Sequence, residues 1–273
     1  MTLIITLIRP EGIWQSADNR VSMGGKIVND NAPKQLHIVC PPLPGGPQML
    51  LGFTGIAVMP DGTPTLKWIE ETLRGDTRTI METLDHLKER LTRDLGKSNL
   101  WKYPLIITGG IFETEKKFYF EIHNIAPNKT AVQTEFKYVV LEVTSPQVFV
   151  GGSGRVHINK ADWLLLSEQI KVKPAKWEDH LGLLAAVNRR AARTDKLVSP
   201  WCQATFLSNG SAGGSSKRFS RPGEPESPLV MHTLLMGIDL SVVSMQAMKM
   251  FQNMENGNTN KTDQLDLSVK GRP

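Results

Sequence analysis

Cysteine is scarce in this sequence, which contains only Cys40 and Cys202 among its 273 residues. The two cysteines lie far apart, and neither belongs to a CxxC pair or to a Cys/His spacing typical of zinc sites. A disulfide framework is therefore not expected, and the sequence predicts a reduced protein of the cytoplasm.

Long apolar runs are also lacking. The first run, over residues 3–8, ends at Arg9-Pro10 and is too short for a signal peptide. No later run reaches the roughly 18 apolar residues that a transmembrane helix needs. We therefore expect neither a secretory leader nor a membrane partner.

Motifs for metals and nucleotides are missing as well. The six histidines form no HExxH or other metal-binding pair. The turn Gly152-Ser153-Gly154 lacks the GxxxxGKS/T frame of a nucleotide site. We expect no metal and no organic cofactor.

The excess of positive charge is small, because 32 Lys+Arg against 27 Asp+Glu give a net charge of +5. Much of this excess is scattered over predicted helix faces, and a cluster of Lys217, Arg218 and Arg221 lies in a stretch rich in Gly, Ser and Pro. Clusters of this kind more often keep a protein soluble than bind a specific nucleic acid. We expect no specific nucleic-acid partner.

Alternating and helical apolar patterns fill most of the first 207 residues. With 40% hydrophobic and 22% charged residues, the composition is that of a globular protein. The patterns predict strands over residues 3–8, 13–17, 35–39, 49–55, 105–108, 118–122, 138–143, 148–150 and 202–207, and helices over 65–73, 77–95, 160–170 and 177–192. Residues 19–34 are expected to form a loop. Strands followed by two helices, twice over, predict an α+β layered domain over residues 1–207.

The character of the chain changes after residue 207. Residues 208–228 are rich in Gly, Ser and Pro, which indicates a flexible linker. A further strand within 228–238 and a Met-rich helix over 241–251 are expected, and residues 253–273 are predicted to be disordered. We therefore assign residues 208–273 to a largely flexible C-terminal extension.

Thr2 follows the initiator methionine and directly precedes the first predicted strand. A hydroxyl is a weak nucleophile at neutral pH unless a base takes its proton. The free α-amine of a terminal threonine has a pKa of about 7.7–8.0 and lies on the same residue as the hydroxyl. Removal of Met1 by methionine aminopeptidase, which accepts small second residues, is expected to expose this amine.

Asp18, Arg20 and Lys34 follow Thr2 by 16, 18 and 32 residues. Asp18 and Arg20 lie two apart beyond a strand, so both can face the start of the strand that follows Thr2. A nearby Lys34 ammonium favours an alkoxide-like transition state, Asp18 can hold that ammonium, and Arg20 can order the loop. The alternative is a solvated surface loop of Asp, Arg and Lys.

This N-terminal pattern resembles that of proteasome β-type subunits and of the related bacterial ATP-dependent peptidase subunit. In that family a leading Thr is also followed by a strand, a turn, a strand ending in Asp-x-Arg, and a Lys at the same interval. The resemblance implies an N-terminal-nucleophile (Ntn) hydrolase with a four-layer αββα sandwich over residues 2–207. It also implies a threonine-type peptidase that hydrolyses amide bonds of peptides or unfolded proteins, in homo-oligomeric stacked rings that can work with an AAA+ ATPase.

Weaker matches to the same family lie further along the chain. Residues 51–57 resemble its strand-to-helix turn, which implies that the Gly55 N–H binds the oxyanion. The turn with Ser153 resembles the family's Gly-Ser-Gly turn, whose serine positions the terminal amine. Asp195 and Ser199 resemble a late Asp/Ser element, but here they are four apart and Pro200 follows, whereas the family spacing is three with a following Gly.

Five mostly apolar residues match the family's pocket for the side chain before the scissile bond. They are Val21, Ala32, Leu36, Phe53 and Ala57. If they line a pocket, it prefers a hydrophobic side chain. The alternative is that all five belong to an ordinary core.

Two other functions stay open at this point. The same fold can serve as a non-catalytic ring or scaffold protein, and a monomeric member can act as an acylase on small amides. The reactivity of Thr2 separates the scaffold from both enzymes.

Overall fold

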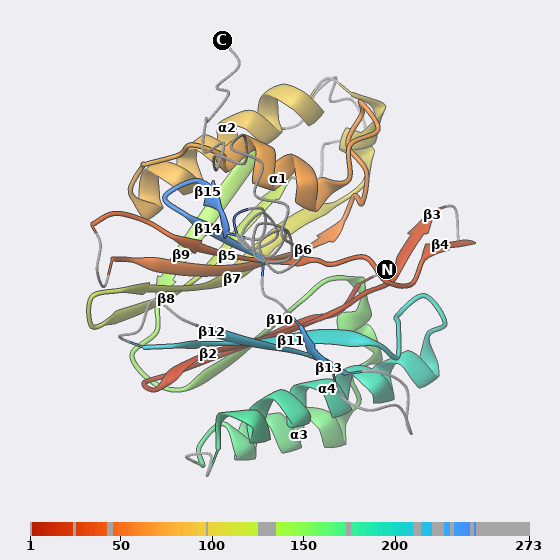
Figure 1. Ribbon diagram of the computed structural model, residues 1–273. Helices are drawn as coiled ribbons and strands as arrows, with labels where there is room; N and C mark the ends of the chain where they lie inside the picture. Colours follow the sequence, from red (N-terminus) through yellow and green to blue (C-terminus); the bar gives the residue numbers. More distant parts are fainter. Residues whose placement is uncertain are drawn as a thin grey trace, which may run out of the picture.

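The computed structural model describes residues 2–23, 26–42, 46–96, 98–124, 135–172, 176–209, 214–219, 227–229, 232–240 and 243. The described chain is an α+β protein dominated by two large sheets that lie one above the other (Figure 1). The α+β class predicted from the sequence is therefore confirmed.

The six-stranded sheet contains the N-terminal hairpin. Its strands, in spatial order, are β10 (Gln147–Gly151), β1 (Ile4–Arg9), β2 (Gly12–Asp18), β11 (Cys202–Ser208), β12 (Gly214–Phe219) and β13 (Ser227–Leu229). Every neighbouring pair is antiparallel. All residues of β1 and β2 are buried, because this hairpin lies in the middle of the sheet.

The seven-stranded sheet covers the other face of this hairpin. Its strands, in spatial order, are β15 (Ile238–Asp239), β14 (Thr233–Leu235), β5 (Gln35–Val39), β6 (Gln48–Gly55), β7 (Leu105–Glu113), β8 (Lys116–Asn124) and β9 (Phe136–Glu142). Only the pairing of β14 with β5 is parallel. A separate hairpin of β3 (Val21–Met23) and β4 (Lys26–Asn29) projects beside the N-terminus (Figure 1).

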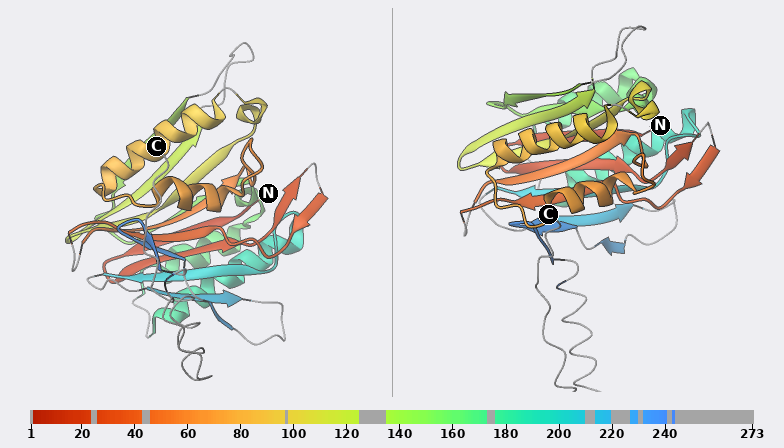
Figure 2. Two further views of the ribbon diagram at one scale, coloured as in Figure 1. Left: turned by 45° about the horizontal axis from the view of Figure 1, so that its top comes forward. Right: turned by 90° about the horizontal axis from the view of Figure 1, so that it is seen from above.

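Four α-helices cover the outer faces of the two sheets (Figures 1 and 2). Helices α1 (Thr65–Leu73) and α2 (Ile80–Leu95) lie on the seven-stranded sheet, and α3 (Lys160–Gln169) and α4 (Trp177–Thr194) lie on the six-stranded sheet. The described residues also contain two short 3-10 helices, η1 (Asn99–Lys102) and η2 (Ser153–His157). In the described part of the chain, no helix has the length and apolar character to span a bilayer.

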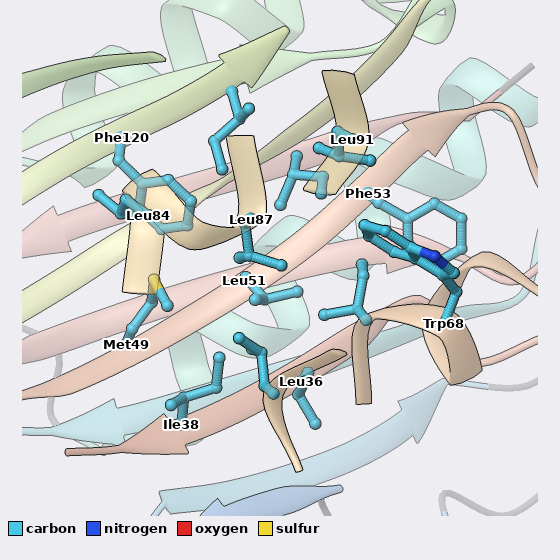
Figure 3. Close-up of a cluster of buried hydrophobic side chains, with 14 of the residues drawn as sticks. Leu36, Ile38, Met49, Leu51, Phe53, Trp68, Leu84, Leu87, Leu91 and Phe120 are labelled. Carbon is cyan, nitrogen blue, oxygen red and sulfur yellow. The ribbon is translucent and has the colours of Figure 1, made fainter. Parts of the chain in front are cut away.

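Three apolar clusters lie between these layers. Leucines of α2 at helical spacing pack on β5, β6 and β8, as Figure 3 shows for Leu84, Leu87 and Leu91 with Leu51 and Phe120. A second cluster joins β1, β2 and β11 to α3 and α4. The third lies between the sheets and contains Ile8, Ile13, Leu50, Phe112 and Leu207 among others.

The four predicted helices correspond to α1–α4. The bounds of α1 are those predicted, and the others differ at one end. Helix α2 starts at Ile80 rather than at residue 77, because Thr79 and Glu82 form a capping box: the Glu82 N–H donates to Thr79 Oγ1 and the Thr79 N–H to Glu82 Oε2. Strand β7 runs on to Glu113, past the predicted end at residue 108, because its partners β6 and β8 pair with it over that length.

The main differences lie where the sequence is polar. The loop predicted over residues 19–34 contains the β3–β4 hairpin. The linker predicted over residues 208–228 contains β12, which pairs along β11. The strand predicted within residues 228–238 is divided between β13 in one sheet and β14 in the other. Apart from residue 243, the helix predicted over 241–251 lies outside the described residues, as does all of 253–273.

Candidate active site

The ends of β1 and β2 bring Thr2 and Asp18 together. The strands are antiparallel neighbours with Ile4 opposite Ala17, so the residue before β1 meets the residue that ends β2. The Leu3 N–H donates to Asp18 Oδ2 at 2.7 Å, and the Asp18 N–H donates to the Leu3 carbonyl at 3.2 Å. The carboxylate is thus attached to the main chain next to Thr2.

Lys34 reaches this point from the other sheet, where it directly precedes β5. Its Nζ donates to Thr2 Oγ1 at 2.7 Å, and the two residues are only 2% and 4% exposed. The contact therefore joins two residues 32 positions apart in a buried environment. The loop alternative for Asp18, Arg20 and Lys34 is wrong, because all three are buried.

The Lys34 side chain is surrounded by three acceptors. Besides Thr2 Oγ1, its Nζ contacts the Arg20 carbonyl oxygen at 2.5 Å and Asp18 Oδ1 at 3.5 Å. Three acceptors match the three hydrogens of an ammonium. Burial lowers the pKa of Lys34, and the negative charge of Asp18 opposes this change.

Asp18 is fully buried and gathers donors from four segments. Oδ2 accepts from the Leu3 N–H, and Oδ1 accepts from the N–H of Arg20 at 2.9 Å, from the N–H of Ser199 at 3.3 Å and from Lys34. A buried carboxylate needs such partners to offset its lost hydration. Asp18 therefore fixes the position of the Lys34 ammonium relative to β1.

The Arg20 side chain contacts residues of two loops. Its guanidinium donates to both carboxylate oxygens of Asp30 and to the carbonyls of Lys196 and Val198. The hydrogen bond with Asp30 raises the pKa of Arg20. The Arg20 main chain contacts Asp18 and Lys34, and its side chain contacts the loop that contains Lys196 and Val198.

The Gly152-Ser153-Gly154 turn lies against the main chain of Thr2. The Gly154 N–H donates to the Thr2 carbonyl at 3.1 Å. Gly152 has φ +89°, and a Cβ there would come within 2.2 Å of the Thr2 carbonyl oxygen, so the approach requires glycine. Ser153 itself is exposed at the start of η2.

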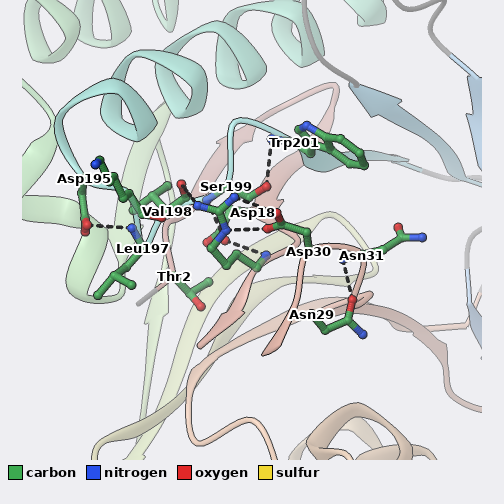
Figure 4. Close-up of polar contacts among 12 residues, drawn as sticks. Thr2, Asp18, Asn29, Asp30, Asn31, Asp195, Leu197, Val198, Ser199 and Trp201 are labelled. Atoms are coloured by element: carbon green, nitrogen blue, oxygen red, sulfur yellow. Dashed lines mark hydrogen bonds and ion pairs between the residues drawn. The ribbon is translucent and has the colours of Figure 1, made fainter. Parts of the chain in front are cut away.

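Asp195 and Ser199 lie on the loop after α4. Asp195 Oδ1 accepts from the Leu197 N–H at 2.8 Å, and Oδ2 lies 3.3 Å from His157 Nε2. Ser199 is buried, its hydroxyl accepts from the Trp201 N–H at 3.1 Å, and its own N–H reaches Asp18. Figure 4 shows this loop beside Thr2 and Asp18. Ser199 therefore joins the cluster through its main chain, and Asp195 through the ordering of the loop.

Gly55 ends β6, but the predicted strand-to-helix turn is wrong. Helix α1 begins only at Thr65, and the intervening segment starts with the Ile56 N–H donating to the Pro104 carbonyl. Gly55 has φ +98°, and a Cβ there would lie 1.9 Å from the Pro104 oxygen. The backbone therefore requires glycine at residue 55 on structural grounds alone.

The five predicted pocket residues divide into two groups. Leu36 and Phe53 are 1% and 3% exposed and belong to the cluster under α1 and α2 (Figure 3). Their surroundings agree with the core alternative. Val21, Ala32 and Ala57 are partly exposed.

Two polar residues near the site were missed by sequence reasoning. Asp30 follows β4 in a run of polar residues, and His157 ends η2. Neither spacing carries a recognisable signal, because their partners Arg20 and Asp195 come from other elements.

Within the described ranges, no group of three or more His, Cys, Asp or Glu residues is arranged to hold a metal ion.

The fold can now be compared with known proteins. No protein-family model matches the chain, and no curated protein matches it. Among solved structures, one protein has a fold similar to that of this chain. That protein is the Anbu (Gly-1) mutant from Hyphomicrobium sp. strain MC1, with a TM-score of 0.52, 14% identity, and coverage of 82% of this chain and 89% of the other. At this identity the likeness concerns the fold.

Proposed function

We propose that this chain is a threonine-type Ntn hydrolase of the four-layer αββα class that cleaves amide bonds with Thr2 after removal of Met1. The observation that carries the proposal is the buried contact of 2.7 Å between Lys34 Nζ and Thr2 Oγ1. A structural hydroxyl has no need of a desolvated ammonium, whereas a nucleophile that develops negative charge is stabilised by one.

The first step is proton transfer and attack. The Thr2 hydroxyl accepts from Lys34, which leaves its own hydrogen to be donated. The base is the α-amine of Thr2, directly or through one water, since its reference pKa of about 7.7–8.0 suits neutral pH. Oγ1 then attacks the substrate carbonyl, and Lys34 stabilises the negative charge at Oγ1 as it forms.

The tetrahedral intermediate and its collapse use the Thr2 amine again, together with the N–H of Gly55. The resemblance of residues 51–57 assigns the oxyanion to this N–H, although a loop and not a helix follows Gly55. The protonated amine of Thr2 gives its proton to the leaving nitrogen. Water then hydrolyses the ester and regenerates Thr2. No metal or organic cofactor takes part.

The remaining predicted residues support the amine and the cation. Asp18 holds Lys34, and Arg20 holds the loop between them. Ser153 positions the terminal amine of Thr2, and Asp195 and Ser199 support the site. The turn that contains Ser153 contacts Thr2 through the Gly154 N–H, which donates to the Thr2 carbonyl. Among the pocket residues, Val21, Ala32 and Ala57 are the partly exposed ones and therefore the best placed to contact a hydrophobic substrate side chain.

The proposed substrates are peptides or unfolded proteins. We further propose cytoplasmic homo-oligomeric rings that enclose the sites, with an AAA+ ATPase as a possible supplier of unfolded chains. These proposals rest on the resemblance of the N-terminal pattern and on the coarse likeness to a proteasome-like fold.

The proposal is tested first on the N-terminus and on Thr2 itself. Intact-mass spectrometry should show loss of Met1, and a β-lactone probe should form an adduct that tandem mass spectrometry assigns to Thr2. Thr2→Ala should abolish both the adduct and cleavage of a fluorogenic peptide, and Thr2→Ser should retain part of both.

A matched control is Thr77→Ala, because Thr77 is exposed and lies outside the site. This variant should react at the wild-type rate. A retained Met1, or an adduct that persists in Thr2→Ala, rules the mechanism out.

The rival function is a non-catalytic ring or scaffold protein with the same fold. The observation on its side is that Thr2 is only 4% exposed in the chain that still carries Met1. A Met1-free protein whose Thr2 does not react with the lactone would establish the scaffold. A monomeric mass in solution together with reactivity would favour the small-amide acylase.

A further inference from the structure

The Arg20 guanidinium is held by more partners than a surface-exposed arginine usually has. Two of its nitrogens contact the two oxygens of Asp30, with Nη2 2.8 Å from Oδ2, and a third contacts the carbonyls of Lys196 and Val198. The Arg20 side chain is 9% exposed and that of Asp30 is 33% exposed. A paired carboxylate and guanidinium in this geometry fix both position and orientation.

The main chain of Arg20 belongs to the candidate site, although its side chain does not contact Thr2. Its N–H donates to Asp18 Oδ1 at 2.9 Å, and its carbonyl accepts from Lys34 Nζ at 2.5 Å. The two peptide groups that flank Arg20 therefore hold the carboxylate and the ammonium. If the guanidinium were released, these peptide groups could rotate, and Lys34 would lose one of its three acceptors.

In the described part of the chain, the carboxylate that the guanidinium contacts is that of Asp30. It is itself held in place, because the flanking turn is closed by the Asn31 N–H donating to Asn29 Oδ1 at 2.7 Å and the Ala32 N–H donating to the Asn19 carbonyl at 3.0 Å (Figure 4). The base of the β3–β4 hairpin is thus linked to the site through one ion pair.

We propose that Asp30 is a positioning residue for the Lys34 ammonium and, through it, for the Thr2 hydroxyl. It acts by holding the Arg20 guanidinium, so that the Arg20 carbonyl stays directed at Lys34 Nζ. The link to Thr2 reactivity rests on the proposed function, whereas the link to Lys34 does not.

The charges around Lys34 give the sign of the expected effect. Asp18 and Asp30 both raise the pKa of Lys34, whereas Arg20 and burial lower it. Loss of the Asp30 carboxylate removes one favourable charge and frees the Arg20 carbonyl to turn away. The pKa of Lys34 should therefore fall in an Asp30→Asn variant.

The experiment compares Asp30→Asn and Asp30→Glu with Asp85→Asn in the full-length protein. Asp85 is a matched control, because it forms a partly exposed ion pair with Lys88 at 2.9 Å on α2. The lactone should label Thr2 about 10- to 100-fold more slowly in Asp30→Asn at saturating probe, with little change in its half-saturation concentration. Asp30→Glu should recover part of the rate, and Asp85→Asn should match the wild type.

A second measurement is independent of any hydrolase activity. NMR titration of 13C-labelled lysine side chains, with Lys34 assigned from a Lys34→Met spectrum, reports the pKa of Lys34 in each variant. A lower pKa of Lys34 in Asp30→Asn supports the positioning role. If the wild type fails to react with the lactone, that failure refutes only the proposed function. The inference is overturned if folded Asp30→Asn keeps both the wild-type pKa of Lys34 and the wild-type labelling rate. An ion pair that only stabilises the fold would change the melting temperature and neither of these two quantities.

Discussion

Replacing Lys34 by Met separates the contribution of the ammonium to stability from its contribution to reactivity. Methionine has a similar length and fills the buried space without a charge. The variant removes the donor to Thr2 Oγ1 but leaves Asp18 with the three N–H donors of Leu3, Arg20 and Ser199. We expect a stable protein whose Thr2 is unreactive.

The stability estimate comes from two opposing effects. The ammonium lies 3.5 Å from Asp18 Oδ1, which corresponds to roughly 5 kcal/mol of attraction at an effective dielectric constant of about 20. Burial of the ammonium costs several kcal/mol in lost hydration, so the two nearly cancel. We expect the free energy of unfolding to change by less than about 2 kcal/mol, or the melting temperature by less than about 8 °C.

The effect on reactivity is expected to be much larger. Loss of one hydrogen-bond donor to a developing negative charge typically costs about 100- to 1,000-fold in rate. The rate of lactone labelling of Thr2, followed by intact-mass spectrometry, measures this fold-change in reactivity. Lys116→Met is the control, because Lys116 forms an exposed ion pair with Glu142 at 3.6 Å and should affect neither quantity.

The pH dependence of stability provides a further test of the same variant. The pKa of Lys34 is lowered in the folded protein from the ordinary value of 10.5, so between the two values the unfolded state binds more protons. Between the folded-state pKa and the ordinary pKa of Lys34, the free energy of unfolding of the wild type should therefore rise with pH relative to that of Lys34→Met. A loss of more than about 5 kcal/mol in Lys34→Met would refute the cancellation, and labelling within twofold of wild type would refute the role of the ammonium.

Two further predictions concern buried polar groups. Asp18→Asn replaces a carboxylate that accepts from four donors and leaves Lys34 without its counter-charge, so urea denaturation should show a loss of about 3–5 kcal/mol. Asp61→Asn, in an exposed loop, should show no measurable loss, and equal effects would contradict the assignment of Asp18 as a buried structural anion. Burial lowers the pKa of His37 from 6.5 to about 4. As the pH drops through that range, the unfolded state takes up the proton first, so the free energy of unfolding should fall by about 3 kcal/mol. The same pH series on His37→Asn should lack this loss, and an identical pH dependence in the two proteins would contradict the prediction.

Local patterns predicted most of the regular structure, because the periodicity of apolar residues reports which face of an element is buried. The leucines of α2 recur at helical spacing, and all of them pack into the cluster on the seven-stranded sheet. The β-branched run of β1 was equally clear. The β3–β4 hairpin was missed because all residues of β4 are exposed and carry no pattern of burial.

The proximity of Thr2, Asp18, Arg20 and Lys34 was also predictable. Two strands joined by a tight turn return the chain to its starting point, so a residue before the first strand meets the residue that ends the second. The position of Lys34 beside Thr2 was inferred from the resemblance of the spacing, because the residues between Arg20 and Lys34 show no pattern that predicts the course of the chain.

Other features depended on contacts between segments far apart in the chain. The Ser199 N–H reaches Asp18 across 181 residues, and Arg20 reaches the Val198 carbonyl across 178. The parallel pairing of β14 with β5 joins residues near 234 to residues near 38. No local pattern specifies such pairings, because they depend on how whole layers pack.

The sequence by itself determined the four helices, most of the buried strands up to residue 207 and the meeting of Thr2 with Asp18, since each follows from residue periodicity and a short turn. Tertiary packing alone decided that Leu36 and Phe53 lie in the core, that Gly55 opens a loop rather than a helix, and that Asp30 holds Arg20. The physical reason is that periodicity specifies which side of an element avoids water, whereas the partner on that side depends on the free energy of the whole packed arrangement.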